Sequence, residues 1–271
     1  MRPMPQPPYS LTRGLAGLGG ALIEEPASWL RVLRFAAVAL VVAASPASWD
    51  RDMRRAAAEQ IHFSAWQPLA SFTFAMALLS YVLIRIVEST AHAYGLSQYA
   101  LGLSTRVLLL ELIPLLAALF VALRSGAAIS TEVALRHVRG DFDALARAGQ
   151  DPLRHDLVPR AIGALAAVLA LAWSSSALAL VIAYVALYGF SPWALESFVR
   201  ITGQVFGPVA MAGYALKTLL FGAAVASIPI TAALGVPRQT EMAPIAVLRG
   251  MVRLGIALAV IEGGFLAMLY A

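Results

Sequence analysis

The sequence predicts an all-α integral membrane protein, built from an N-terminal interfacial helix and five transmembrane helices. Of its 271 residues, 60% are hydrophobic and only 13% are charged, whereas ordinary soluble domains have roughly 45–50% and about 25%. The hydrophobic residues are gathered in segments long enough to cross a bilayer, which takes about 20 residues in a helix. We therefore expect most of the helix surface to face lipid.

The N-terminal region is expected to stay on one side of the membrane. Residues 1–27 are rich in proline and glycine, which predicts a poorly ordered cytoplasmic N-terminus. Residues 28–44 are expected to form a helix in the cytoplasmic interface. Three side chains near its start would lie at the level of the lipid headgroups: Trp29, Arg31 and Arg34. A short sixth span is the alternative for this segment.

Five later segments are the expected spans of a single membrane domain that covers residues 28–271. Their approximate bounds are 66–87, 107–123, 162–188, 205–230 and 245–270. The second span contains Pro114 and is shortened by Arg124. The third apolar stretch is longer than one span needs, so we expect it to tilt or to begin in the interface.

The positions of the arginines predict the topology, because short cytoplasmic loops carry an excess of Lys and Arg. The chain has 19 arginines and a single lysine, Lys217. Seven arginines lie in the first 65 residues and six in the interval 124–160, whereas 189–204 has one. This places the N-terminus in the cytoplasm and the C-terminus outside. A basic run with interleaved aromatics is missing, so nucleic-acid binding is not indicated.

The residue types exclude several kinds of chemistry. There is no cysteine, which rules out disulfides and thiolate sites. The four histidines do not have the spacing of a metal motif, and neither a nucleophile elbow nor a phosphate-binding loop occurs. We expect no catalytic site, no metal site and no directly bound cofactor.

Residues 141–147 predict a short amphipathic helix inside the polar interval 124–160. Phe142, Leu145 and Ala146 fall on one face at helical spacing, and Gly149 and Pro152 follow as end signals. Such a helix could insert its apolar residues into a groove on a soluble partner. The alternative is a connecting helix that packs on its own bundle, and the pattern does not separate the two.

Charged residues inside the spans need partners, because each costs at least ~2.5–3.5 kcal/mol near the bilayer centre. Arg85 and Glu88 are expected to pair with each other near the outer end of the first span. Pro114 frees a backbone carbonyl near residue 110, which predicts a polar cluster around Glu111. Glu111 with Arg106 either lines the outer part of a cavity at a dimer interface or forms a structural ion pair.

Lys217 and Glu262 likewise have either a structural role or a role in binding a molecule. Lys217 lies roughly midway along the fourth span and Glu262 lies in the last. Lys217 either pairs with Glu262 or Glu111 to hold helices together, or contacts a bound molecule directly.

One stretch resembles a known family of permeases. Leu110 to Pro114, Arg124 to Glu132, Asp143 to Leu145, Asp151 to Leu153 and Val158 to Arg160 are similar to the signature of the MlaE/YrbE permeases, and the register holds without a gap over 110–160. Lys217, Arg249 and Glu262 extend the resemblance into the last two spans.

The resemblance implies a permease that works as a dimer in the bacterial inner membrane. Such permeases pair with a cytoplasmic ABC ATPase, which would bind ATP and Mg, and with a periplasmic MCE-domain protein, to move phospholipid or another lipid. The segment 138–147 would be the coupling helix that contacts the ATPase through Arg139, Asp141, Phe142, Asp143, Leu145 and Arg147. Arg106, Glu111, Lys217 and Glu262 would line the lipid path. Motif residues with structural roles would be Pro114, Arg124, Gly126, Glu132, Pro152 and Arg160.

The chain departs from the family pattern at three positions. Leu110 stands where the family usually has arginine, Ile113 replaces a glycine, and Gly140 replaces a glutamate. Arg106 lies four residues before Leu110 and is a candidate replacement for the arginine, because residues at i and i+4 share a helix face. Gly140 indicates either a partner ATPase with a different groove or pairing with an unlike permease.

Two other classes of protein are the alternatives. An ion-coupled secondary transporter usually contains two repeated halves, and this sequence has no internal repeat. An intramembrane lipid-modifying enzyme would need convergent catalytic groups, whereas the intramembrane charges stand one per helix. The permease is therefore the interpretation that the sequence favours.

Overall fold

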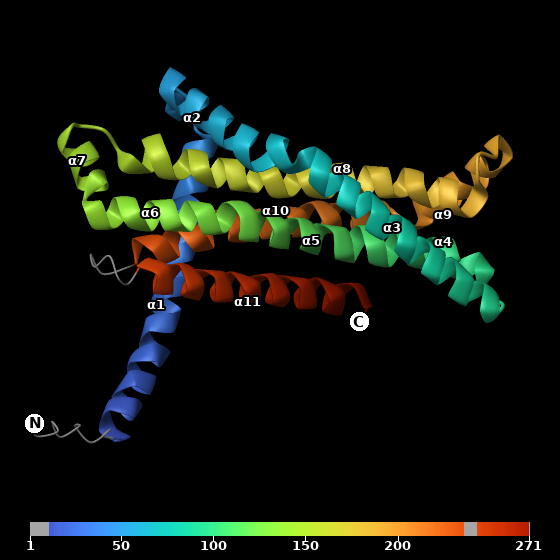
Figure 1. The fold of residues 1–271 in the computed structure, drawn as a ribbon, viewed down its shortest axis with the longest axis horizontal. Coiled ribbons are helices and arrows are strands. Elements are labelled where there is room, and N and C mark those ends of the chain that lie inside the picture. Colours follow the sequence, from blue (N-terminus) through green and yellow to red (C-terminus); the bar gives the residue numbers. More distant parts are fainter. Residues whose placement is uncertain (1–10, 236–242, 271) are drawn as a thin grey trace, which may run out of the picture.

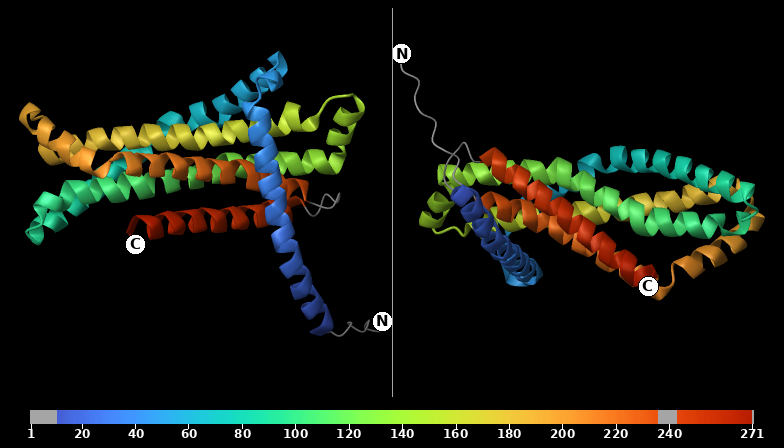
Figure 2. Two further views of the ribbon diagram at one scale, coloured as in Figure 1. Left: turned by 180° about the vertical axis from the view of Figure 1, so that it is seen from behind. Right: turned by 90° about the horizontal axis from the view of Figure 1, so that it is seen from below.

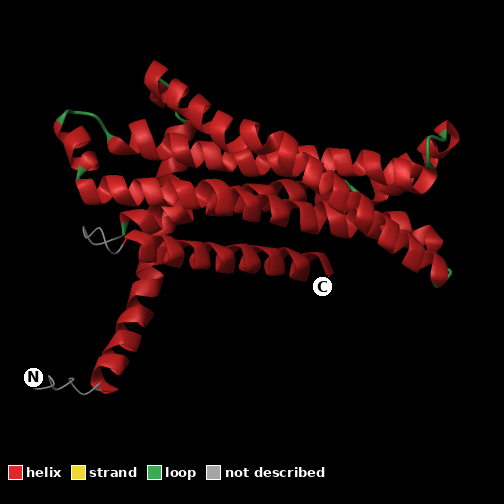
Figure 3. Ribbon diagram, viewed as in Figure 1, coloured by secondary structure: helices red, strands yellow, loops and turns green. Residues whose placement is uncertain are grey.

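The computed structural model describes residues 11–235 and 243–270, and in these residues it contains helices and loops but no strand (Figure 3). The helices are α1 (Leu11–Ala44), α2 (Arg51–Ile61), α3 (Gln67–Ala93), α4 (Ser97–Thr105), α5 (Ile113–Val121), α6 (Ala127–Arg139), α7 (Asp141–Arg147), α8 (Val158–Tyr188), α9 (Leu195–Val205), α10 (Pro208–Leu234) and α11 (Ala243–Tyr270). Short 3₁₀ turns occur at Pro46–Ser48 and Pro192–Ala194. The all-α prediction is confirmed.

Several of these helices join end to end into longer rods through π-helical turns, at His62–Trp66, Arg106–Leu112, Ala122–Gly126 and Leu153–Leu157. Three of these four turns in the described chain end two residues before a proline: Pro68, Pro114 and Pro159. Proline has no N–H and its ring clashes with the carbonyl four residues earlier. Widening the preceding turn to an i→i+5 pattern relieves this clash without ending the helix.

Six helical stretches among the described residues are long and apolar enough to cross a membrane: Ala27–Ala44, Arg51–Ala93, Tyr99–Arg139, Leu153–Tyr188, Pro208–Leu234 and Val247–Met268. The last five run side by side as one elongated bundle (Figure 1). Each of these five overlaps one of the five predicted spans. The first stretch is part of α1.

The spans differ from their predicted bounds chiefly at charged residues. The second was expected to end near Arg124, but its helix continues from α4 to Arg139. The first was expected to start at residue 66, but α2 extends the rod back to Arg51. Buried Met53 and Ala57 let α2 pack while its arginines stay exposed, and the Asp50 side chain caps it by accepting from the Met53 N–H at 2.8 Å. A charged residue therefore did not mark a helix end.

The remaining three spans shift by a few residues. The third begins at Val158 rather than 162, the fourth covers Pro208–Leu234 rather than 205–230, and the fifth begins at Ala243 rather than 245. The separate helix α9 accounts for the shift of the fourth span, because Gly207 and Pro208 divide α9 from α10. A proline is well suited to the first position of a new helix.

Helix α8 forms the centre of the bundle and contacts α2, α3, α5 and α10. Small residues allow these close contacts. A Cβ atom on Gly163 would lie 2.7 Å from Gln60 Cβ in α2, and one on Gly222 of α10 would lie 2.5 Å from the Leu165 side chain in α8. Glycine at these crossings lets the backbones approach, as is common between membrane helices.

Helix α1 lies across the five rods rather than alongside them (Figures 1 and 2). Its Val32 and Phe35 are buried, and α1 contacts α8 and α10. Residues 1–10 of the segment that was expected to be poorly ordered lie outside the described residues, whereas 11–27 belong to α1. Leucines at 11, 15, 18 and 22 recur at helical spacing, and each glycine costs a helix only about 1 kcal/mol relative to alanine.

The bundle has two distinct ends (Figure 1). One end, here the α7 end, carries α7, the start of α2 and the crossing of α1. The other, here the α9 end, carries α9 and the α3–α4 turn, and α11 runs toward it from the α7 end. The start of α2 and the α6–α7 hairpin, which hold several of the arginines, both lie at the α7 end.

Candidate functional site

Three charged residues from three different helices meet inside the bundle, and we call them the Lys217 triad: Glu111, Lys217 and Glu262. Lys217 of α10 is only 2% exposed. Its Nζ forms ion pairs with Glu111, which lies in the π-helical turn before α5, and with Glu262 of α11, the second at 2.8 Å. The sequence places these charges one per helix, but the fold brings them together because α10 contacts both α5 and α11.

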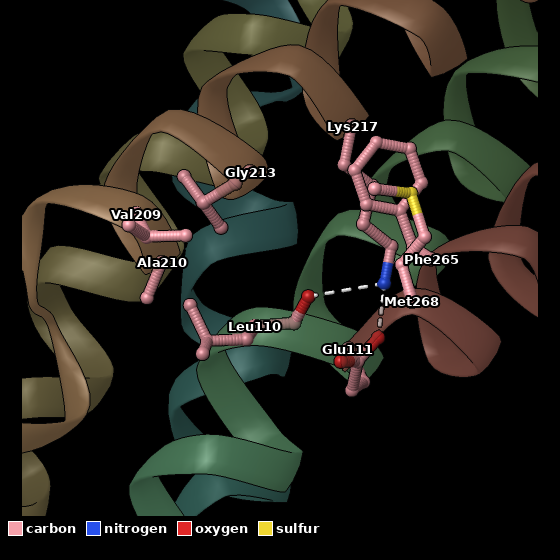
Figure 4. Close-up of a pocket in the computed structure, with 9 residues that line it drawn as sticks. Leu110, Glu111, Val209, Ala210, Gly213, Lys217, Phe265 and Met268 are labelled. Atoms are coloured by element: carbon pink, nitrogen blue, oxygen red, sulfur yellow. Dashed lines mark hydrogen bonds and ion pairs between the residues drawn. The ribbon is translucent and has the colours of Figure 1, made fainter. Parts of the chain in front are cut away.

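The Lys217 ammonium also donates to the backbone carbonyl of Leu110 at 3.1 Å (Figure 4). In a regular helix that carbonyl would accept from the N–H of residue 114, which is a proline. Pro114 therefore leaves an acceptor free inside the bundle, and Lys217 fills it. The prediction of a polar cluster near residue 110 is confirmed. Lys217 Nζ also lies 5.9 Å from the centroid of the Phe221 ring, within cation–π range.

A cavity of about 140 Å³ opens next to Glu111 and Lys217, between α10, α11 and the π-helical turn before α5. Its walls are mostly apolar, with Glu111 and Lys217 as its charged lining residues (Figure 4). The lining residues are Leu110, Glu111, Val209, Ala210, Gly213, Tyr214, Lys217, Phe265 and Met268. Val209 and Met268 are each 85% exposed, so the cavity reaches the outer surface of the bundle. A polar group bordered by an apolar wall suits an amphiphilic molecule.

Arg106 does not take the place predicted for it. Leu110 is buried, whereas Arg106 is exposed, so the two side chains lie on different faces. The backbone over Arg106–Leu112 is π-helical rather than α-helical. Arg106 is therefore not a replacement for an arginine at position 110.

A second cluster of charges, here the α6–α8 ion cluster, consists of Glu132, Arg136, Asp156 and Arg160. The Arg160 guanidinium donates to both oxygens of Glu132 at 2.6 and 2.7 Å, and to Asp156 at 3.0 Å. Arg136 pairs with Glu132 at 2.9 Å and with Asp156 at 3.0 Å. Arg160 is 5% exposed. A bidentate pair of this kind fixes geometry as well as charge.

This cluster joins the chain before the loop that carries α7 to the chain after that loop. Glu132 and Arg136 lie in α6 before the loop, and Asp156 and Arg160 lie in the π-helical turn and α8 after it. Two ion pairs, Arg136 with Asp156 and Arg160 with Glu132, therefore join the two arms of the helical hairpin that carries α7, and the other two pairs lie within one arm each. A displacement of α7 would be passed to α6 and α8 as one unit.

Helix α7 forms where the sequence predicts a short amphipathic helix. Gly140, with φ of 78°, makes the sharp turn between α6 and α7, and Gly149, also at 78°, ends the hairpin tip. Phe142 packs against the bundle core, as the alternative of a connecting helix expects. Asp143, Ala144, Ala146 and Arg147 stay exposed. The helix thus has one anchored face and one open face.

Arg124 is a structural link between two rods. Its guanidinium donates to the Phe63 carbonyl at 3.0 Å and to Gln67 Oε1 at 2.9 Å, and lies 5.2 Å from the Phe63 ring centroid. Pro68 has no N–H for the Phe63 carbonyl in the i→i+5 pattern of the adjoining turn. Arg124 thus donates to a backbone carbonyl that a proline leaves without its helical partner, as Lys217 does.

Other motif residues have simpler places. A Cβ atom on Gly126 would lie 3.5 Å from the Pro229 side chain of α10, at a close crossing of helices. Pro152 directly precedes the π-helical turn after the α7 loop, and Arg139 is exposed at the end of α6. Arg85 and Glu88 pair at 2.6 Å, as predicted.

Sequence reasoning missed Arg136, Asp156 and Gln67. Arg136 follows Glu132 by four residues and Asp156 precedes Arg160 by four, which is the spacing of ion pairs on one helix face. That signal could have found the four-residue cluster. Gln67 carries no such signal, because its partner Arg124 is distant in the sequence.

Together the fold and the two charge clusters define a multi-pass membrane protein with a polar site inside its bundle and a tied hairpin at one end. The sequence matches the family described as Permease MlaE over residues 57–268. Since this match covers most of the chain, the protein belongs to the MlaE permease family. A search of curated proteins finds no match to the sequence.

Proposed function

We propose that this protein is the membrane subunit of an ABC transporter that moves phospholipid or another lipid between the bacterial inner membrane and the outer parts of the envelope. The single observation that carries the proposal is the α7 hairpin, in which a helix with an open face lies between two long rods, α6 and α8, that two ion pairs join. Membership of the permease family agrees with this role. A separate ATPase would supply the energy, with its ATP and Mg.

In this proposal α7 is the coupling helix. Its exposed residues would enter a groove on the ATPase, while Phe142 anchors it to the bundle. Because α6 and α8 are tied together, movement of the ATPase would shift both rods against their neighbours. Helix α6 contacts α10 and α11, which carry Lys217 and Glu262, so such a shift would reach the cavity beside the triad. A change of cavity shape with different lipid affinity in each state is what transport requires.

The proposal also covers topology and partners. The α7 end would face the cytoplasm, with α1 in the inner interface, as the excess of arginine there supports. The α9 end would face the periplasm, where an MCE-domain protein would bind. A second permease chain, of the same or another kind, would complete the membrane part.

The open face of α7 provides a direct test. Asp143→Arg reverses a charge in its first turn and is expected to lower co-purification of the ATPase about tenfold, because an interface residue of this kind contributes about 1.4 kcal/mol or more. Glu196→Arg makes the same change in the first turn of α9, at the opposite end. The tagged full-length chain is purified in mild detergent from its native cells, and co-purifying proteins are quantified by mass spectrometry.

The matched control decides the interpretation. Loss of the ATPase with Asp143→Arg and retention with Glu196→Arg supports α7 as the docking element. Equal retention of the ATPase by both variants contradicts the role of α7. A chain that carries no ATPase at all, even unmodified, contradicts the transporter assignment.

A further inference from the structure

The charge count of the Lys217 triad is unusual for a site that receives a phosphate-bearing lipid. Two carboxylates face one ammonium, so the triad carries a net charge of −1 when both are ionised and 0 when one is protonated. In neither state does the cavity beside it present a net positive charge. An anionic group entering the cavity would meet the Glu111 carboxylate and an ammonium that is already paired with two carboxylates.

The lysine has little left to offer a ligand. An ammonium has three N–H donors, and three protein oxygens already surround Lys217 Nζ: the Leu110 carbonyl, Glu111 Oε2 and Glu262 Oε2. A phosphate that bound Lys217 would compete with these three oxygens. Glu111 lines the cavity, and its second oxygen is an acceptor in addition to the one paired with Lys217.

The size of the cavity limits what can enter. At about 140 Å³ it is comparable to a cavity of ~150 Å³ that holds one benzene molecule. A headgroup fragment fits this volume, whereas two acyl chains do not. The chains would lie along the exposed apolar residues at the mouth, such as Val209 and Met268.

We propose that the cavity beside the Lys217 triad selects lipids whose headgroup ends in a cationic hydrogen-bond donor, such as a primary ammonium, and rejects lipids with a net anionic headgroup. This inference rests on the proposed function in lipid transport and names its substrate class. The ammonium would donate to the outer oxygen of Glu111, which lines the cavity, while Glu262 adds to the negative charge of the triad. Its phosphate would remain at the mouth of the cavity, away from the carboxylates.

Lipid retention by the full-length chain tests the selection. The purified protein is exchanged into mixed micelles with equal amounts of phosphatidylethanolamine, phosphatidylcholine and phosphatidylglycerol that share the same acyl chains. After washing, retained lipid is quantified by mass spectrometry. We expect retention of phosphatidylethanolamine over phosphatidylglycerol by about tenfold. Phosphatidylcholine, which has the same net charge as phosphatidylethanolamine but no N–H donor, should fall between them.

Two variants, Glu262→Gln and Leu110→Arg, test whether the triad causes the preference, and Glu88→Gln is the control. Glu262→Gln keeps the shape of the side chain, removes one carboxylate, and should reduce the preference to about twofold or less. Glu88→Gln removes a carboxylate that pairs with Arg85 outside the triad, and should leave the preference unchanged. Leu110→Arg adds a cation to the cavity wall and should raise retention of phosphatidylglycerol. Thermal unfolding measurements check that each variant is folded. If Leu110→Arg does not fold, Glu262→Gln alone tests the selection.

The outcomes separate this inference from the function on which it rests. Phosphatidylglycerol retained as well as phosphatidylethanolamine, or a preference that persists in Glu262→Gln, overturns the selection while lipid binding stands. Retention of none of the three lipids overturns lipid carriage itself, and with it the proposed function.

Discussion

Replacing Lys217 by methionine is expected to destabilise the protein by about 3–5 kcal/mol, because it leaves two carboxylates buried without their cation. Lys217 is 2% exposed, and both Glu111 and Glu262 are largely buried, at 12% and 13% side-chain exposure. The Leu110 carbonyl also loses its donor. The midpoint of thermal unfolding in detergent, followed by tryptophan fluorescence, should fall on the order of 10 °C.

A neutral replacement of the whole triad serves as the control for this prediction. Lys217→Met combined with Glu111→Gln and Glu262→Gln removes the uncompensated charge and should recover most of the lost stability, since exchanging a buried ion pair for neutral groups is often close to neutral. A single variant Lys217→Met with the melting temperature of the unmodified chain would show that the triad does not hold the helices together. A triple variant as unstable as the single one would show that the loss of stability comes from altered packing rather than from uncompensated charge.

Replacing Arg160 by methionine is expected to have the second largest effect, about 2–3 kcal/mol. The bidentate pair with Glu132 and the pair with Asp156 are both lost. Breaking a fully buried pair costs more, but Glu132 is 48% exposed, so water compensates part of the loss. Arg136 still pairs with both acids. The melting temperature should therefore fall by several degrees rather than collapse.

The functional consequence of Arg160→Met should exceed its effect on stability. With only the Arg136–Asp156 pair left between the hairpin arms, movement of α7 should pass to α8 less effectively, so stimulation of ATP hydrolysis by lipid in the reconstituted complex should fall while the ATPase still binds. Arg55→Met provides the control, because Arg55 forms only an exposed pair with Glu59. Normal lipid stimulation in Arg160→Met would contradict the role of the α6–α8 ion cluster in coupling.

The order and approximate position of the long apolar helices could be predicted because hydrophobic length is a property of each segment alone. The helix ends could not be predicted correctly, because an arginine was expected to lie in water and therefore to end a span. Arg124 remains inside a helical rod because the Phe63 carbonyl, left free by Pro68, accepts its hydrogen bond. Its partner lies 61 residues away in the chain, so no local pattern reveals it.

Part of the candidate site could be predicted because that part depends on a local effect in the sequence. The effect of Pro114 on the carbonyl of residue 110 is local, and the polar cluster expected there is present. The convergence of Glu111, Lys217 and Glu262 depends on how three helices are rotated about their axes, which hydropathy does not determine. The place predicted for Arg106 was wrong, because its side chain is exposed whereas that of Leu110 is buried.

The central claim, that the α7 end faces the cytoplasm and the α9 end the outside, can be measured directly because the chain has no cysteine. Single variants Ala144→Cys in α7 and Glu196→Cys in α9 place a thiol at exposed positions of opposite ends. In cells whose inner membrane is intact, a membrane-impermeant maleimide should label Glu196→Cys at once and Ala144→Cys only after permeabilisation. Labelling of Ala144→Cys before permeabilisation, with Glu196→Cys protected, would contradict the account.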